Sequence, residues 1–214
     1  VGLPMSYAGR LDPMAEGVLV ILVGDECKEK DKYINLDKEY EVEVLFGIKT
    51  DTGDILGIIS EVNPGFIDLN KIILNKYFGK FVQDYPAYSS KTINGIQLHI
   101  LAREGKLPDE MPKKEVNIYS IDISGHSIRT GQEISDYSIV NISKVKGDFR
   151  QRDIIEKWKL FGLQYGGRDF LILKIKVSCS SGTYMRILAQ KIAEDMGTVG
   201  AAFSIKRTRV GDYI

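Results

Sequence analysis

Cysteine and histidine are scarce in this sequence, with two residues of each kind among 214. Cys27 and Cys179 form no CxxC pair, so the sequence supports neither a zinc site nor a disulfide framework. His99 and His126 lie far apart and have no acidic or sulfur ligand at metal spacing. The sequence therefore predicts two reduced thiols and no bound metal.

Long hydrophobic runs are also absent. The longest apolar run, from Gly17 to Gly24, covers a strand and is far shorter than the roughly 20 residues that a membrane helix needs. The basic, apolar and small-residue pattern of a secretion signal does not follow Val1. We therefore expect a soluble, cytoplasmic protein with no membrane partner.

An excess of charge of one sign is the third absence. Lysine plus arginine and aspartate plus glutamate number 29 each, so the formal net charge is +0. The overall field therefore does not favour nucleic acid, and an RNA-binding surface has to be a local patch. Residues 141–159 are locally basic, although a solvated face is the commoner meaning of such a run. The cations of this run are Lys144, Lys146, Arg150, Arg152, Lys157 and Lys159, and its anions are Asp148, Asp153 and Glu156.

Hydrophobic periodicity predicts the elements of the first part of the chain. We expect a buried strand over residues 18–23 and a polar helix over 26–36. In the strand that follows, Tyr40 shares one face with three apolar residues, and glutamates occupy the other face. The apolar residues are Val42, Val44 and Phe46, and the glutamates are Glu39, Glu41 and Glu43. The alternation predicts that Tyr40 points inward.

The remaining pattern favours an α+β fold. Apolar spacing predicts a packing helix over 68–78 and a short helix over 96–103, with a candidate subdomain seam near 106–115. Short strands are expected over 116–146. The clearest strand, 171–179, precedes an amphipathic helix that starts near Met185 and stops at Gly197. Because strands and helices do not alternate regularly, we expect a mixed or antiparallel sheet.

Two residues suggest a charged site. Asp12 precedes Pro13, which favours an extended backbone and a fixed side chain at the end of a loop, although a turn or helix-cap aspartate explains the same pattern. Arg186 lies in the first turn of a predicted helix, where the macrodipole disfavours a cation, so it needs a carboxylate partner unless it extends into water. If Asp12 is that partner, the pair keeps the aspartate ionised in a water-poor site, as a nucleophile requires.

Aromatic residues near these two positions could line a pocket. Tyr40 on its inward face and Tyr184 just before Arg186 would offer stacking surface to a flipped base, although buried tyrosines are usually part of a core. The run from Asp51 to Asp54 lacks the third acidic position and the downstream glutamate of an EF-hand loop, so we do not predict a calcium site.

Several separate blocks of the sequence, in this order, resemble the TruB family of tRNA pseudouridine synthases. The blocks are Gly9–Leu19 with Gly-Arg-Leu-Asp-Pro, Lys38–Gly57 with Lys-Glu-Tyr and Thr-Asp-Thr, Pro86–Gly105 with Ser-Ser-Lys and Ala-Arg-Glu-Gly, Cys179–Arg186 with Cys-Ser-Ser-Gly-Thr-Tyr-Met-Arg, and Ile205–Gly211 with Ile-Lys-Arg-Thr. The resemblance implies a pseudouridine synthase sheet with flanking helices and an RNA-contacting insertion.

The resemblance also implies roles for individual residues. Asp12 takes the place of the catalytic aspartate, Tyr40 that of the active-site tyrosine, and Arg186 that of the arginine that pairs with the aspartate. Neither a metal nor an organic cofactor is implied, and tRNA is the implied partner. The implied substrate-binding residues are Tyr7, Arg10, Leu11, Lys91, Tyr184, Ile205 and Arg207.

The chain departs from the family pattern in three places. Tyr7 stands where the family has a histidine, so rate or substrate choice is expected to differ. From the positions of the catalytic block and of Ile214, we also expect this protein to lack the family's N-terminal strand and Lys-Pro segment and its PUA-type RNA-binding domain. We therefore expect residues 1–214 to form one catalytic domain whose RNA affinity depends on local basic patches.

The implied function is the isomerisation of a flipped-out uridine, in the T arm of tRNA, to pseudouridine by a monomeric enzyme. Two alternatives stay open: a synthase that acts on another or a guide-directed RNA, and a catalytically silent RNA-binding or tRNA-folding module, which the change to Tyr7 favours. The sequence leaves open the exact target position, the chemical route of Asp12 and the oligomeric state.

Overall fold

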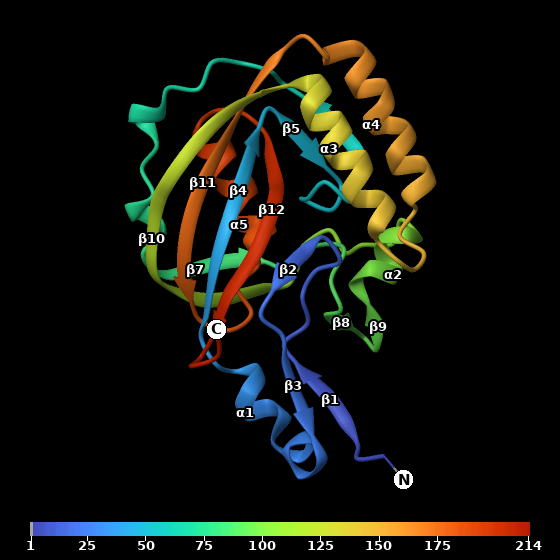
Figure 1. Ribbon diagram of the computed structural model, residues 1–214, viewed down its shortest axis with the longest axis vertical. Helices are drawn as coiled ribbons and strands as arrows, with labels where there is room; N and C mark the ends of the chain where they lie inside the picture. The colour runs from blue at the N-terminus through green and yellow to red at the C-terminus, as the bar shows by residue number, and fades with distance from the viewer. Residues whose placement is uncertain (1) are drawn as a thin grey trace.

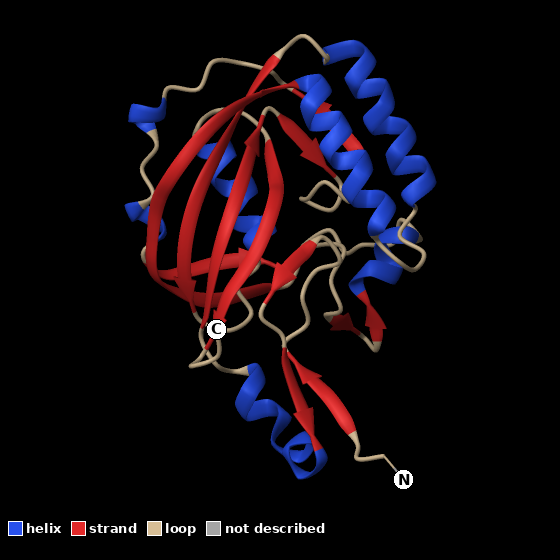
Figure 2. Cartoon of the chain, in the orientation of Figure 1, coloured by secondary structure: helices blue, strands red, loops and turns tan. Residues whose placement is uncertain are grey.

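The computed structural model describes residues 2–214 and is built around one sheet (Figures 1 and 2). Within those residues the sheet has six strands in the order β2-β12-β4-β11-β10-β7. The strands are β2 (Ala15–Gly17), β12 (Gly200–Val210), β4 (Lys38–Phe46), β11 (Asp169–Cys179), β10 (Lys113–Thr130) and β7 (Gly79–Asp84). Because β2 runs parallel to β12 while the other pairs are antiparallel, the sheet is mixed and the predicted α+β fold is confirmed.

Helices cover both faces of this sheet. Helix α5 (Met185–Asp195) packs on the face that carries Val42 and Val44 of β4 and Leu173 of β11. Helices α3 (Gly131–Lys144) and α4 (Gln151–Tyr165) pack on the opposite face, where Leu45 and Ile172 lie (Figure 1). Successive side chains of a strand point to opposite faces, so the sequence alternation in β4 and β11 sets these two cores. The inward face predicted for β4 and the strand and helix predicted around 171–197 are confirmed.

Smaller elements surround the sheet. A hairpin of β1 (Met5–Ala8) and β3 (Val20–Val23) projects at the N-terminal end together with α1 (Lys30–Ile34) (Figure 1). The other elements are the 3-10 helices η1 (Gly24–Glu29), η2 (Leu69–Lys71) and η3 (Asn75–Tyr77), the strands β5 (Ile48–Thr50), β6 (Ile59–Val62), β8 (Thr92–Ile93) and β9 (Ile96–Gln97), and helix α2 (Leu98–Arg103). No helix within residues 2–214 is both long and apolar enough to cross a membrane.

Two of the expected helices are shorter than the sequence pattern indicated. The helix expected over 68–78 is wrong, because η2 and η3 form two single turns separated by the extended residue Ile72. Leu69, Ile72 and Tyr77 still reach the core that packs on α5, so their spacing reflects burial and not a continuous helix. Of the helix expected over 26–36, only residues 30–34 form an α-helix, which is α1. The residues before it form the 3-10 helix η1.

The expectation of short strands over 116–146 is also wrong. A single long strand, β10, runs from Lys113 to Thr130, and α3 follows it directly. Thr130 and Glu133 form a capping box that starts α3, a signal present in the sequence. Helix α4 was not expected, although Ile154, Trp158 and Phe161 are buried at helical spacing, because charged residues dominate that run.

The strand expected to be buried over 18–23 is only half buried. In β3, Val20 and Leu22 are buried while Ile21 and Val23 are exposed. The strand pairs with β1 in a two-stranded sheet, so one of its faces lies outside the core. The subdomain seam near 106–115 stays a prediction; residues 104–112 connect α2 to β10.

Candidate active site

A cavity of about 880 Å³ opens where the loop of Asp12 meets the sheet and the start of α5. Its other walls come from α1, α2, β4, β12, the loop of residues 52–56, the segment 88–90 and residues 148–150 between α3 and α4. Nine of the ten site residues predicted from the sequence line this cavity, and Lys91 is the exception. Instead, Lys91 places its Nζ 5.1 Å from the centre of the Tyr85 ring.

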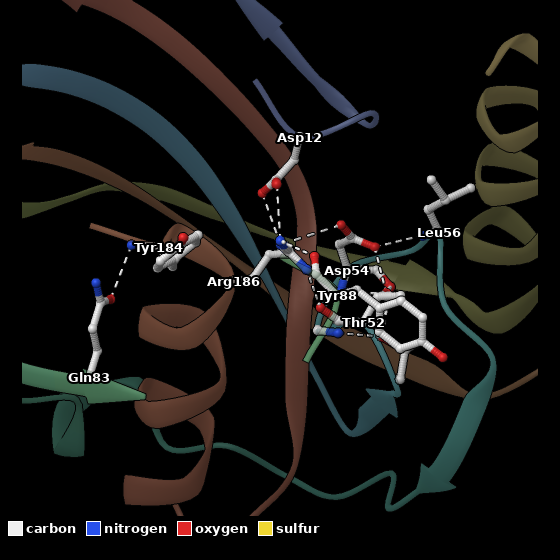
Figure 3. Close-up of polar contacts among 10 residues, drawn as sticks. Asp12, Thr52, Asp54, Leu56, Gln83, Tyr88, Tyr184 and Arg186 are labelled. Atoms are coloured by element: carbon white, nitrogen blue, oxygen red, sulfur yellow. Dashed lines mark hydrogen bonds and ion pairs between the residues drawn. The ribbon is translucent and has the colours of Figure 1, made fainter. Parts of the chain in front are cut away.

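Asp12 and Arg186 form a bidentate ion pair in this cavity (Figure 3). Nε of Arg186 donates to Oδ2 of Asp12 at 2.8 Å, and a terminal nitrogen donates to Oδ1 at 2.9 Å. The Arg186 side chain is 3% exposed and that of Asp12 is 29% exposed. The carboxylate therefore faces the cavity while its partner lies behind it, and the pairing predicted from the helix position of Arg186 is confirmed.

The remaining donors of Arg186 hold backbone carbonyls of two loops. One terminal nitrogen donates to the Thr52 carbonyl at 2.7 Å and the other to the Tyr88 carbonyl at 3.2 Å. Burial disfavours the positive charge of Arg186, but the negative charges of Asp12 and Asp54 outweigh the effect of burial. The pKa of Arg186 is therefore raised, and the side chain stays a cation. Because the Arg186 guanidinium is hydrogen-bonded on several sides, its orientation is fixed, and it can in turn orient Asp12.

Asp54 is a second carboxylate beside Arg186, and sequence reasoning missed it as a site residue. Its Oδ2 lies 3.8 Å from Nε of Arg186, and its Oδ1 accepts from the Thr52 hydroxyl at 2.7 Å and the Leu56 amide at 3.0 Å. Burial raises the pKa of the Asp54 carboxyl against the effect of Arg186. The sequence signal was the Asp51–Asp54 run, which we rejected as a calcium loop and otherwise used only as part of a block that resembles the TruB family. Among residues 2–214, no group of three or more His, Cys, Asp or Glu side chains is placed to hold a metal ion.

Arg207 secures both ends of the loop that carries Asp12. Its side chain is fully buried, Nε donates to the Val18 carbonyl at 2.8 Å, and a terminal nitrogen donates to the Gly9 carbonyl at 2.9 Å. Gly17 is required here, because a Cβ on Gly17 would lie 2.1 Å from the Arg207 carbonyl oxygen. The parallel pairing of β2 with β12 thus sets the loop of Asp12 directly on Arg207.

Tyr40, Tyr184 and Ile205 supply the apolar walls of the cavity. Burial raises the pKa of Tyr40 to about 12, so its side chain is a neutral phenol at neutral pH. The Tyr184 ring meets the Tyr85 ring edge to face at 5.7 Å. Ile205 of β12 is buried beside Ala15 of β2.

Gln83 of β7 holds the backbone just before Arg186 (Figure 3). Its side-chain nitrogen donates to the Gly182 carbonyl at 2.7 Å, and its side-chain oxygen accepts from the Tyr184 amide at 3.0 Å. Gln83 is 1% exposed, so both ends of a buried amide are satisfied by this one loop. Sequence reasoning missed Gln83, because only the pairing of β7 with β10 brings it here.

Tyr7, Arg10 and Leu11 lie at the mouth of the cavity. Arg10 donates to the Tyr7 hydroxyl at 3.0 Å, and the Lys30 amine lies 5.5 Å from the centre of the Tyr7 ring. The hydrogen bond from Arg10 lowers the pKa of Tyr7. An aromatic ring between two cations is suited to a nucleotide, which combines a flat base with an anionic phosphate.

The geometry as a whole presents the Asp12 carboxylate, held by a buried arginine, to a cavity with aromatic and aliphatic walls. Such a carboxylate can act as a nucleophile or a base, and the walls can accept a planar ring.

Comparison with known proteins agrees with this geometry. The family model described as "TruB family pseudouridylate synthase (N terminal domain)" matches residues 4–147, and the chain belongs to this family. It is 31% identical over 212 residues to the tRNA pseudouridine synthase B of Borreliella afzelii (strain PKo), covering 98% of this chain and 60% of that protein. It is also 31% identical over 211 residues to the enzyme of the same name from Francisella tularensis subsp. novicida (strain U112), covering 97% of this chain and 56% of that protein. The chain thus spans less than two thirds of the length of these relatives.

Solved structures show the same fold. A Cbf5-Nop10-Gar1 complex contains a chain that matches with a TM-score of 0.55 at 16% identity, over 98% of this chain and 41% of that one. An H/ACA RNP bound to a substrate RNA containing 2′-deoxyuridine matches with a TM-score of 0.52 at 16% identity, over 98% of this chain and 39% of that one.

Proposed function

We propose that this protein is an RNA pseudouridine synthase that isomerises a uridine flipped out of the T arm of tRNA. The observation that carries the proposal is the bidentate pair of Arg186 with Asp12 at the wall of an open cavity. Membership of the TruB family and the tRNA pseudouridine synthase B relatives support tRNA as the partner.

In this proposal Asp12 is the catalytic carboxylate. It drives cleavage of the bond between C1′ of the ribose and N1 of uracil; the freed uracil rotates, a bond forms from C5 to C1′, and the proton lost from C5 is replaced by one on N1. The product has the same atoms as the substrate, so the reaction needs no external reactant. Two hydrogen bonds from Arg186 fix the orientation of the carboxylate that this step uses.

The cavity walls would hold the base during this rotation. Tyr40, as a neutral phenol, stacks on uracil, and Tyr184 and Ile205 enclose it. Tyr7, Arg10 and Leu11 contact the nucleotides at the mouth, and Lys91 contacts the RNA outside the cavity. Unpairing a base costs a few kcal/mol, and least in a loop, which suits a structured RNA loop as the substrate.

The proposal is tested by the release of tritium from tRNA transcripts that contain 5-tritiated uridine, followed by mass-spectrometric mapping of pseudouridine. The wild-type protein is expected to release tritium at one T-arm position, and Asp12→Asn to release none while it binds tRNA normally. Asp25→Asn is the matched control, because the Asp25 side chain is 95% exposed and lies outside the cavity lining. Tritium release that persists in Asp12→Asn would reject the proposal.

A second candidate is a catalytically silent RNA-binding or tRNA-folding module, favoured by Tyr7 at the position of the family's histidine. In that case the wild-type protein and Asp12→Asn bind tRNA equally and neither forms pseudouridine. A synthase directed by a guide RNA would form product only when that RNA is added.

A further inference from the structure

The helical hairpin of α3 and α4 contributes one wall of the cavity. β10 and β11 are antiparallel neighbours whose ends pair at Thr130 and Asp169, so residues 131–168 leave the sheet and return to the same place. The tip between the two helices lies beside α2 (Figure 1). Three residues of this tip, Asp148, Phe149 and Arg150, line the cavity.

Arg150 joins this tip to two other segments of the cavity wall. A terminal nitrogen lies 2.7 Å from Oδ2 of Asp51, and the guanidinium carbon lies 4.5 Å from the centre of the Tyr88 ring. The Tyr88 hydroxyl donates to the same Asp51 oxygen at 3.2 Å. The other Asp51 oxygen accepts from the Ile58 amide at 2.8 Å. Arg150 therefore links the loop of Asp51 to the segment of Tyr88.

The backbone of Arg150 supports a specific role. Its φ is 63° and its ψ is 25°, a left-handed conformation that disfavours residues with a Cβ. Arg150 also starts α4, a helix anchored in the core by Trp158, whose indole nitrogen donates to the Ile55 carbonyl at 3.0 Å. A helix whose inner face is anchored in the core thus presents the guanidinium from a fixed position.

The two segments that Arg150 links are the two that hold Arg186. Thr52 follows Asp51 directly, and its carbonyl accepts from Arg186 at 2.7 Å. The Tyr88 carbonyl accepts from Arg186 at 3.2 Å. Arg150 and Arg186 therefore contact the same two segments. Arg150 contacts the side chains of Asp51 and Tyr88, and Arg186 donates to the backbone carbonyls of Thr52 and Tyr88.

We propose that Arg150 is a positioning residue of the active site, which sets the orientation of Arg186, and through it of Asp12, by clamping the Asp51 loop to the Tyr88 segment. The inference rests on the proposed function. It differs from direct RNA binding by Arg150, because the guanidinium is already paired with Asp51 and stacked on Tyr88 and its side chain is only 22% exposed.

The test compares Arg150→Met, Arg150→Lys, Asp51→Asn and the double variant Arg150→Met/Asp51→Asn with the wild-type protein. Arg168→Met is the matched control, because Arg168 is exposed at the base of the same hairpin and lies outside the cavity lining. The measurements are kcat at saturating tRNA, KM, the melting temperature, and hydrogen exchange of peptides that cover residues 51–58 and 86–91.

We expect Arg150→Met to lower kcat by about 10- to 100-fold, since a small displacement of reacting groups has an effect of that size. KM and the melting temperature are expected to change little. Hydrogen exchange is expected to become faster in both peptides. Arg150→Lys should recover part of kcat, because it keeps the charge but loses the planar stack on Tyr88. The double variant should be no slower than Arg150→Met, because both changes remove one clamp.

Each of the other outcomes rejects the inference that Arg150 positions Arg186 by linking the Asp51 loop to the Tyr88 segment. An unchanged kcat in Arg150→Met, with turnover still dependent on Asp12, rejects the inference and leaves the proposed function standing. A raised KM with an unchanged kcat makes Arg150 an RNA contact. A loss of activity that follows the melting temperature makes it a residue of the core. If the wild-type protein forms no pseudouridine, the proposed function fails, and unchanged exchange in Arg150→Met then rejects the clamp independently.

Discussion

Arg186 and Asp12 are 174 positions apart in the chain, yet Arg186 donates to both oxygens of Asp12, at 2.8 and 2.9 Å. The same arginine lies 3.8 Å from Asp54, so one buried cation serves two carboxylates. Asp12 faces the cavity and Asp54 is enclosed. Of the two carboxylates, Asp12 is therefore the more accessible to a molecule in the cavity.

Arg186→Met should abolish pseudouridine formation and destabilise the fold. The change leaves Asp54 buried without its cation, and breaking a buried pair in this way costs about 3–5 kcal/mol of the free energy of unfolding. Urea denaturation measures the loss. Arg186→Met/Asp54→Asn should regain much of the stability, because the buried charge is gone, but no activity. A double variant as unstable as Arg186→Met would contradict this role of Asp54.

Replacing Gln83 should impair catalysis more than RNA binding. Gln83→Met leaves the Gly182 carbonyl and the Tyr184 amide without their buried partner, which we expect to cost about 2 kcal/mol of unfolding free energy. The loop before Arg186 then becomes more mobile and positions Arg186 less well, so kcat should fall while KM stays unchanged. Gln164→Met is the control, because Gln164 is exposed on α4. A change in KM alone would argue that Gln83 acts on the RNA-binding surface.

Arg207→Lys should lower kcat by about 10- to 100-fold by loosening the loop of Asp12. An ammonium cannot reproduce both hydrogen bonds, to the Gly9 and Val18 carbonyls, in the geometry of a guanidinium. Single-turnover kinetics at saturating tRNA isolate this effect. Arg209→Met on the same strand is the control, since its half-exposed pair with Glu39 contributes about 0–1 kcal/mol. If only KM rises in Arg207→Lys, Arg207 contacts the substrate directly.

The two thiols should react differently with iodoacetamide. Cys179 is fully buried, and burial raises the pKa of its thiol to about 11, so it stays protonated and inaccessible at pH 8. Cys27 is partly exposed. Native protein should therefore incorporate one label, at Cys27, and unfolded protein two. Native labelling of Cys27→Ser would show that Cys179 is accessible.

Burial of Cys179 also predicts a dependence of stability on pH. The pKa of the thiol is higher in the folded protein, at about 11, than its ordinary value of 9.0. Its contribution to stability is therefore complete below pH 9 and is lost as the pH rises toward 11. In urea denaturation, the wild-type protein should lose stability relative to Cys179→Ala between pH 8 and pH 10. A constant difference would contradict the shift.

Local patterns were enough to predict part of the fold and of the site. The alternation in β4 and β11, the start of α5 and the need of Arg186 for a carboxylate were all read from neighbouring residues, and the structure confirms each one. The capping box at Thr130 and the buried spacing of α4 were equally local but were hidden by surrounding charges. The catalytic and binding roles of the predicted residues stay predictions until they are tested.

The sequence by itself determined the family, the mixed α+β class and the identity of the carboxylate and its arginine, because these depend on motifs and on the period of side chains along one element. Only the tertiary structure decided that Asp54 shares Arg186, that Gln83 and Arg207 hold the two loops of the site, and that Arg150 reaches Asp51. These contacts join segments that are distant in the chain. Strand order and helix packing bring such segments together, and no local pattern encodes the resulting distances.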